Sequence, residues 1–118
     1  MPFDWRGYLA LARSLHHESA GINEEAAWRS AVSRAYYAAF CHVRNHARDH
    51  EGFAGTGDVD DHVRLRDHLH RQDETKLAQE LGKLRGWRNQ CDYRDEVHNL
   101  AAMVGAATAT AQAAIDRV

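Results

Sequence analysis

The sequence predicts an all-α protein, an up-and-down bundle of four or five helices. Its single proline is Pro2, so no later segment is interrupted by a proline ring. No alternation of apolar and polar residues typical of a strand continues beyond four residues. Apolar residues instead recur at helical spacing along the chain. The length of 118 residues fits a single helical domain that covers residues 1–118.

Apolar residues at helical spacing place the first helix at about residues 3–17, with Asp4 favourable in its first turn. Asn23 is a good N-cap for the second helix, because its side chain accepts a backbone N–H. We expect that helix to be long and to end near Arg48. Alanines beside its apolar stripe would let another helix approach closely.

The remaining helices follow a glycine-containing loop at residues 51–57. Asp58 is expected to cap a short third helix, and Asp73 a fourth helix that ends near Tyr93. The fifth helix is expected over about residues 95–117. Alanines cover most of the face opposite its apolar stripe, which favours burial on two sides, the second by another subunit.

Composition argues against several classes of protein. A formal net charge of -2 and a pI of about 6.5 disfavour a protein that coats nucleic acid without specificity, but they permit a local basic groove. Two cysteines form no disulfide framework, so a cytoplasmic localisation is expected. The N-terminal residues lack the pattern of a secretory signal, and residues 100–115 are too weakly apolar to span a bilayer. We therefore expect no membrane association.

One arginine stands where the helical pattern calls for an apolar residue. Leu81 and Leu84 lie on a stripe that continues to Arg88 and Cys91. Removing a charge from water without a partner is costly. Arg88 is therefore expected either to form a structural ion pair or to face a cleft that receives an anion. The acidic residues within reach along the chain are Asp92, Asp95 and Glu96.

Two segments together resemble the HEPN domain family (higher eukaryotes and prokaryotes nucleotide-binding). They are SRAYYAAFCHVRNHA at residues 33–47 and LRGWRNQCDY at residues 84–93. The order of features is similar too, with a loop and a short helix between the two segments. The resemblance covers about residues 5–115 and implies a helical bundle that forms a homodimer.

Many HEPN proteins are metal-independent ribonucleases that act as toxins or in defence, and their dimer cleft is lined by arginine and histidine. Carried over, the resemblance implies catalytic roles for Arg88, for its polar neighbour Asn89 and for Tyr93, which stands where the short form of the signature has histidine. It also implies a nucleotidyltransferase antitoxin as a partner and RNA or a nucleotide as ligand. Further residues expected to bind the ligand are Arg34, Tyr37, His42, Arg85 and Asp92.

RNA cleavage without a metal ion requires removal of the 2′-hydroxyl proton, stabilisation of charge on phosphorus and protonation of the leaving oxygen. Arginine suits the second task, because its planar fork meets two phosphate oxygens. Tyrosine, with a reference pKa of about 10, is a weak base at neutral pH. A histidine from outside the signature is a further candidate for proton transfer, either His42 or His62.

Two other functions remain open from the sequence. The chain is a non-catalytic interaction module if Arg88 is only a structural ion pair and the fifth helix serves assembly. A metal-dependent hydrolase is the third possibility, because His42, His46 and His50 recur at intervals of four on one helix face. No metal-binding motif such as His-Glu-x-x-His and no phosphate-binding glycine loop is present, so we expect neither a metal ion nor a cofactor.

Overall fold

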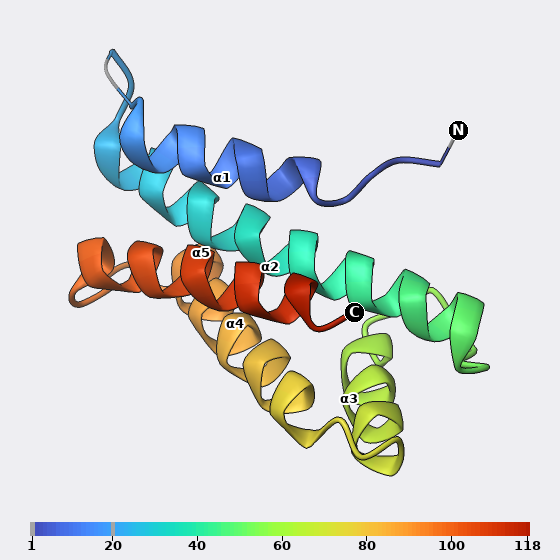
Figure 1. The fold of residues 1–118 in the computed structure, drawn as a ribbon. Coiled ribbons are helices and arrows are strands. Elements are labelled where there is room, and N and C mark those ends of the chain that lie inside the picture. Colours follow the sequence, from blue (N-terminus) through green and yellow to red (C-terminus); the bar gives the residue numbers. More distant parts are fainter. Residues whose placement is uncertain (1, 20) are drawn as a thin grey trace.

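The computed structural model describes residues 2–19 and 21–118, and within these ranges the chain is all-α, without strands (Figure 1). This confirms the predicted fold class, a helical bundle. The helices of the described chain are α1 (Gly7–His17), α2 (Glu24–His50), α3 (Asp61–Arg71), α4 (Thr75–Tyr93) and α5 (Leu100–Asp116).

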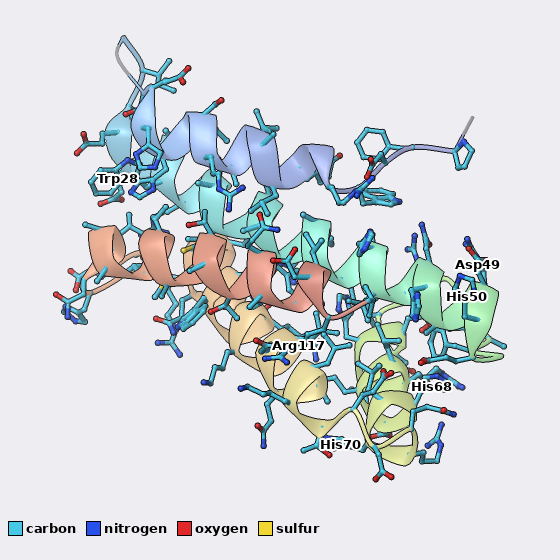
Figure 2. All side chains as sticks on the ribbon, in the orientation of Figure 1. Trp28, Asp49, His50, His68, His70 and Arg117 are labelled. Carbon is cyan, nitrogen blue, oxygen red and sulfur yellow. The ribbon has the colours of Figure 1, made fainter. Side chains whose placement is uncertain are left out.

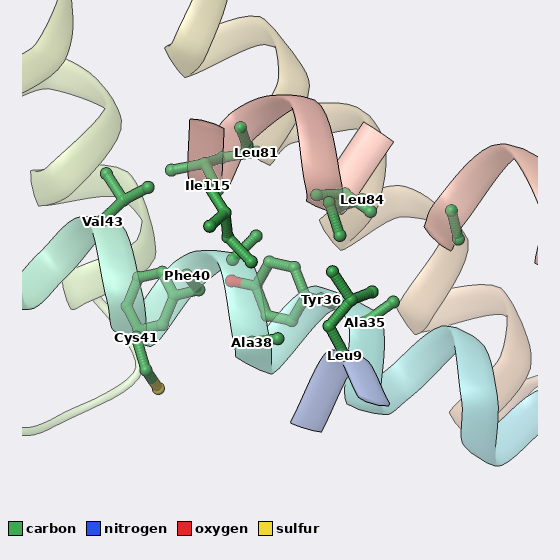
Figure 3. Close-up of a cluster of buried hydrophobic side chains, with 14 of the residues drawn as sticks. Leu9, Ala35, Tyr36, Ala38, Phe40, Cys41, Val43, Leu81, Leu84 and Ile115 are labelled. Atoms are coloured by element: carbon green, nitrogen blue, oxygen red, sulfur yellow. The ribbon is translucent and has the colours of Figure 1, made fainter. Parts of the chain in front are cut away.

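Helix α2 is the central element of the bundle. It packs against α1, α4 and α5, whereas α3 packs mainly against α4 (Figure 1). Asn23 caps α2 as predicted, because its side-chain oxygen accepts the backbone N–H of Ala26 at 3.0 Å. Tyr36 of α2 is 1% exposed and lies within the main core cluster (Figure 3). The other helices contribute Leu9, Leu65, Leu81, Leu84 and Ile115 to the same core.

Two helices begin later than the sequence predicts, because side chains bind backbone groups that a helix would use. The backbone N–H of Arg6 donates to the Asp4 carboxylate at 3.0 Å, and α1 begins only at Gly7. Such a local turn competes with a helix. Helix α5 begins at Leu100 instead of residue 95, because Arg29 binds the carbonyl oxygens of the preceding segment.

The predicted caps of α3 and α4 are also wrong. Asp58 accepts the N–H of Asp60 before α3 begins at Asp61, and Asp73 adopts a left-handed φ of 59° before α4. The Asp61 carboxylate turns back to the loop, where it accepts the backbone N–H groups of Thr56 and Gly57 at 2.8 Å. A Cβ at residue 55 would lie 2.9 Å from this carboxylate, which explains the glycine there.

Helix α5 closes the bundle with small side chains. Ala107, Ala111 and Ala114 are fully buried, whereas Ala102 and Ala106 are exposed on the opposite side. After α5, the side chain of Arg117 reaches back to Glu80 of α4 and forms an ion pair (Figure 2). Within the described ranges, none of the helices is both long enough and apolar enough to cross a lipid bilayer.

Candidate functional site

The last two turns of α4 bring the three predicted catalytic residues together. The Nη1 of Arg88 donates to the amide oxygen of Asn89 at 3.0 Å, and its Nη2 donates to the Tyr93 hydroxyl at 3.5 Å. The guanidinium carbon lies 5.3 Å from the ring centre of Tyr37 and 5.5 Å from that of Tyr93. Stacking and hydrogen bonds thus hold the guanidinium in a defined orientation.

Arg88 also has a carboxylate partner. Its Nε lies 2.9 Å from Oδ2 of Asp92, and the two side chains are 15% and 27% exposed. The N–H bond does not point at this oxygen, so the contact is an ion pair without a well-directed hydrogen bond. Ser33 of α2 donates to the same carboxylate oxygen at 3.4 Å. The ion pair considered from the sequence is therefore present, and through Ser33 it connects α4 to α2.

A hollow of about 570 Å³ lies beside Arg88 on the outer side of α4. Its lining residues are Gly86, Asn89, Gln90, Tyr93 and Arg94. Tyr93 is 74% exposed, and nothing lies within 4 Å of a Cβ added at Gly86. The amide nitrogen of Asn89 and the hydroxyl hydrogen of Tyr93 keep donor capacity for a ligand, because both side chains contact Arg88 through oxygen.

Helix α3 contributes a histidine to this region. A ring nitrogen of His62, Nδ1, contacts the hydroxyl of Tyr36, and the ring stacks on Phe40 with 4.4 Å between ring centres. The ring is half-buried between α2 and α3. Of the two histidines considered for proton transfer from outside the signature, His62 is the one connected to Arg88, through the adjoining rings of Tyr36 and Tyr37, whose centres lie 5.2 Å apart.

The charges of three arginines act on this histidine. Burial is the largest cause that lowers the pKa of His62 from 6.5 to about 4. Three guanidinium charges lower it further, those of Arg85, Arg88 and Arg66 in order of effect. Arg66 reaches α4 over Gly82, where its Nη1 would lie 3.3 Å from an added Cβ. We call Arg66, Arg85 and Arg88 the arginine cluster.

Negative charge is scarce in the arginine cluster. In the described part of the chain, neither Arg66 nor Arg85 forms an ion pair, and the Nε atoms of both are shielded from solvent without a hydrogen-bond acceptor. Of the three arginines, only Arg88 has a carboxylate partner among the described residues, namely Asp92. Buried donors without acceptors are uncommon in folded proteins, and an anion is one of the partners that would satisfy them.

Two predicted ligand-binding residues lie elsewhere on α2. The guanidinium of Arg34 lies 5.1 Å from the ring centre of Tyr8 in α1. His42 lies close to Arg6 and Asp4, and burial followed by the charge of Arg6 lowers its pKa. The fold therefore groups Tyr37, Arg85 and Asp92 with Arg88, and places Arg34 and His42 toward the N-terminal segment.

Sequence reasoning missed Arg29, which holds the end of α4 in place. Its Nη1 donates to the carbonyl oxygen of Cys91 at 3.1 Å and to that of Arg94, and its Nη2 donates to Asp95 at 2.9 Å. These carbonyl groups flank Asp92 and Tyr93. The only sequence signal is the spacing of Glu25 and Arg29, which form an ion pair one helical turn apart. Arg66 was missed too, because nothing in the sequence places α3 against α4.

The other titratable groups form no site of this kind. Among residues 2–19 and 21–118, no group of three or more His, Cys, Asp or Glu side chains is arranged to hold a metal ion. The rings of His46 and His50 lie 4.8 Å apart near the end of α2. Burial raises the pKa of the Cys91 thiol to about 11 and also raises that of Cys41, so both cysteines are protonated at neutral pH.

The lowered pKa of His62 predicts a pH-dependent stability. The unfolded chain binds this proton with the ordinary pKa of 6.5 and the folded protein with a pKa of about 4, so stability falls as the pH drops through this window. We expect the melting temperature to decrease from pH 7 to pH 4.5, and to decrease less in His62→Gln. The exposed His70→Gln is the control and should follow the wild type. The same pH dependence in His62→Gln and wild type would contradict this role of His62.

No family model, curated protein or solved structure matches this chain. The resemblance to HEPN domains therefore rests on the two sequence segments quoted above. The contacts around Arg88 and His62 are the basis for the functional proposal that follows.

Proposed function

We propose that this chain is a HEPN-type protein that binds RNA phosphate with the arginine cluster and cleaves the strand without a metal ion. The observation that carries this proposal is that three guanidinium charges act on one neutral histidine, which is connected to Arg88 through the rings of Tyr36 and Tyr37. Two of the three, Arg66 and Arg85, have no ion-pair partner in the described chain. A phosphodiester has the charge and the acceptor oxygens that would satisfy them.

The proposed reaction uses His62, Arg85, Arg88 and Tyr93, of which Arg88 and Tyr93 are in direct contact. At pH 7 the ring of His62 is neutral. In the tautomer whose Nδ1–H donates to the Tyr36 hydroxyl, Nε2 is free to take the proton of the 2′-hydroxyl. The 2′-oxygen then attacks phosphorus, and Arg85 and Arg88 stabilise the charge that develops on the phosphate oxygens. The Tyr93 hydroxyl is the proposed proton donor to the leaving 5′-oxygen. The products would be a 2′,3′-cyclic phosphate and a free 5′-hydroxyl.

The proposal includes a homodimer and a role in a toxin–antitoxin or defence system. Tyr93 and the hollow beside it are exposed in the single chain, and the alanine face of α5 is free as well. Either surface is open to a second copy. A nucleotidyltransferase antitoxin is the proposed partner. By covering the arginine cluster, this partner would prevent RNA from reaching it.

An interaction module without catalysis is the second candidate, and the ion pair between Arg88 and Asp92 favours it. In that case Arg88 serves only to connect α4 with α2 through Asp92 and Ser33. Partly exposed ion pairs of this kind are common at helix ends, and they contribute modestly to stability. A purely structural role as an interaction module, however, does not explain why Arg66 and Arg85 form no ion pair among the described residues.

Incubation of the purified protein with labelled single-stranded RNA in excess EDTA tests the proposal. We expect cleavage products that end in a 2′,3′-cyclic phosphate, and we expect expression of the wild type to stop cell growth. Cleavage that EDTA abolishes would instead indicate the metal-dependent hydrolase. Intact RNA, together with normal growth, would favour the interaction module.

A further inference from the structure

A stripe of cationic and aromatic side chains runs along α2 away from the arginine cluster. The stripe consists of Arg34, Tyr37, Arg44 and Arg48 and includes the buried Cys41; these positions recur at alternating intervals of three and four residues, so they lie on one side of the helix. Arg48 forms an ion pair with the exposed Asp49. At a rise of about 1.5 Å per residue, the stripe is roughly 21 Å long. Tyr37 joins it to the arginine cluster, because the Arg88 guanidinium stacks on this ring.

Two arginines of the stripe are held by aromatic rings instead of carboxylates. Arg34 lies over Tyr8 at 5.1 Å, and Arg44 lies 5.8 Å from the ring centre of Trp5 and 5.9 Å from that of Phe40. In the described ranges neither arginine forms an ion pair. A stacked guanidinium keeps its flat orientation. The Nε and Nη2 of Arg44 donate to the amide oxygen of Asn45 at 3.1 and 3.0 Å, and its Nη1 remains a donor for a ligand. Both side chains are therefore oriented to meet an anion.

The N-terminal segment adds exposed aromatic surface beside the stripe. Phe3, Trp5 and Tyr8 pack edge to face, with ring centres 4.9 to 5.4 Å apart. Phe3 is 54% exposed. The carboxylate nearest to these rings along the chain, Asp4, is bound by Arg6 at 2.8 Å. Over this surface, arginines that can contact phosphates thus alternate with aromatic rings that can stack on bases.

We propose that this surface is a second binding element, which holds the part of a single-stranded RNA that continues beyond the arginine cluster. Arg34 and Arg44 would contact phosphates, and the rings of Phe3 and Trp5 would stack on bases. Bases in a duplex are already stacked on one another, so this combination fits a single strand. An acidic peptide would use the arginines but not the rings. This inference rests on the proposed function in one respect: the bound strand is taken to lead to Arg88, where it would be cleaved.

Binding of a fluorescein-labelled 2′-O-methyl uridine 12-mer, measured by anisotropy, tests the second element without cleavage. We expect Arg34→Gln and Arg44→Gln each to weaken binding about fivefold to tenfold, and each to reduce the salt slope by about 0.7. Trp5→Leu should weaken binding about tenfold with an unchanged slope, since stacking involves no counterion. Arg13→Ala is the control, because Arg13 faces α5, where it donates to Gln112.

The outcomes separate this inference from the proposed function. A dinucleotide bound at Arg88 is too short to reach Arg44, so Arg44→Gln should cleave it at the wild-type rate while it binds the 12-mer more weakly. If the wild type binds the 12-mer but cleaves no RNA, the catalytic proposal fails and the second element stands. The second element is overturned if the stripe variants bind like Arg13→Ala, if the wild type does not bind the 12-mer, or if duplex RNA or an acidic peptide binds more tightly.

Discussion

Replacing Arg88 by alanine should lower the rate of RNA cleavage by about 100-fold, the usual cost of losing one group that stabilises transition-state charge. Stability should change by no more than about 1 kcal/mol, because a single partly exposed ion pair contributes little. The measurement is the cleavage rate of labelled RNA in EDTA, with far-UV circular dichroism and urea unfolding to confirm that Arg88→Ala remains folded.

Asp92→Asn is the matched control, because it breaks the same ion pair from the other side. It removes the negative charge beside Arg88 while the guanidinium stays, so cleavage should continue and RNA should bind at least as tightly. If Arg88 has only a structural role, both variants should lose similar stability and neither should change the behaviour toward RNA. Equal loss of cleavage in both variants would contradict the assignment of Arg88 to the phosphate.

Arg29→Ala should have the largest effect on stability among the polar residues of the site. It removes a cation that is bound to three backbone carbonyl groups and is only 18% exposed. Hydrogen bonds to charged groups contribute about 1.5–3 kcal/mol each, and water that enters the truncated site recovers part of this. We expect the free energy of unfolding to fall by about 2–3 kcal/mol in urea titrations.

The same variant should also reduce RNA cleavage, because Asp92 and Tyr93 lie within the segment that Arg29 holds. Arg13→Ala, which loses one exposed hydrogen bond to Gln112, should stay within about 0.5 kcal/mol of the wild type. A loss below about 1 kcal/mol in Arg29→Ala would show that the 91–95 segment keeps its conformation without this side chain.

The fold class could be predicted because helical periodicity and the absence of interior prolines both depend on local sequence. Helix starts could not be placed as well, because they depend on where a side chain finds a backbone partner. Asp4 and Arg29 both bind backbone groups that the sequence pattern assigned to helices. Asn23 was predictable because its cap involves only the next turn.

The residues of the candidate site divide in the same way, into those placed by local sequence and those placed by packing between helices. Arg88, Asn89 and Tyr93 could be grouped from the sequence, because they lie within two turns of one helix. The connection of His62 to Arg88 depends on the packing of α3 against α2 and α4, which no sequence spacing encodes. His42 was an equal candidate in the sequence, yet α2 turns it toward Arg6 and Asp4.

The central claim is that the guanidinium groups of Arg85 and Arg88 contact RNA phosphate. The most direct measurement follows the arginine Nε–H signals by NMR while a 2′-O-methyl uridine dinucleotide is added, with assignments from Arg85→Lys and Arg88→Lys. We predict that both signals shift and saturate at one dissociation constant, while the signal of Arg13 stays constant. Stationary signals from Arg85 and Arg88 at saturating dinucleotide would contradict the account.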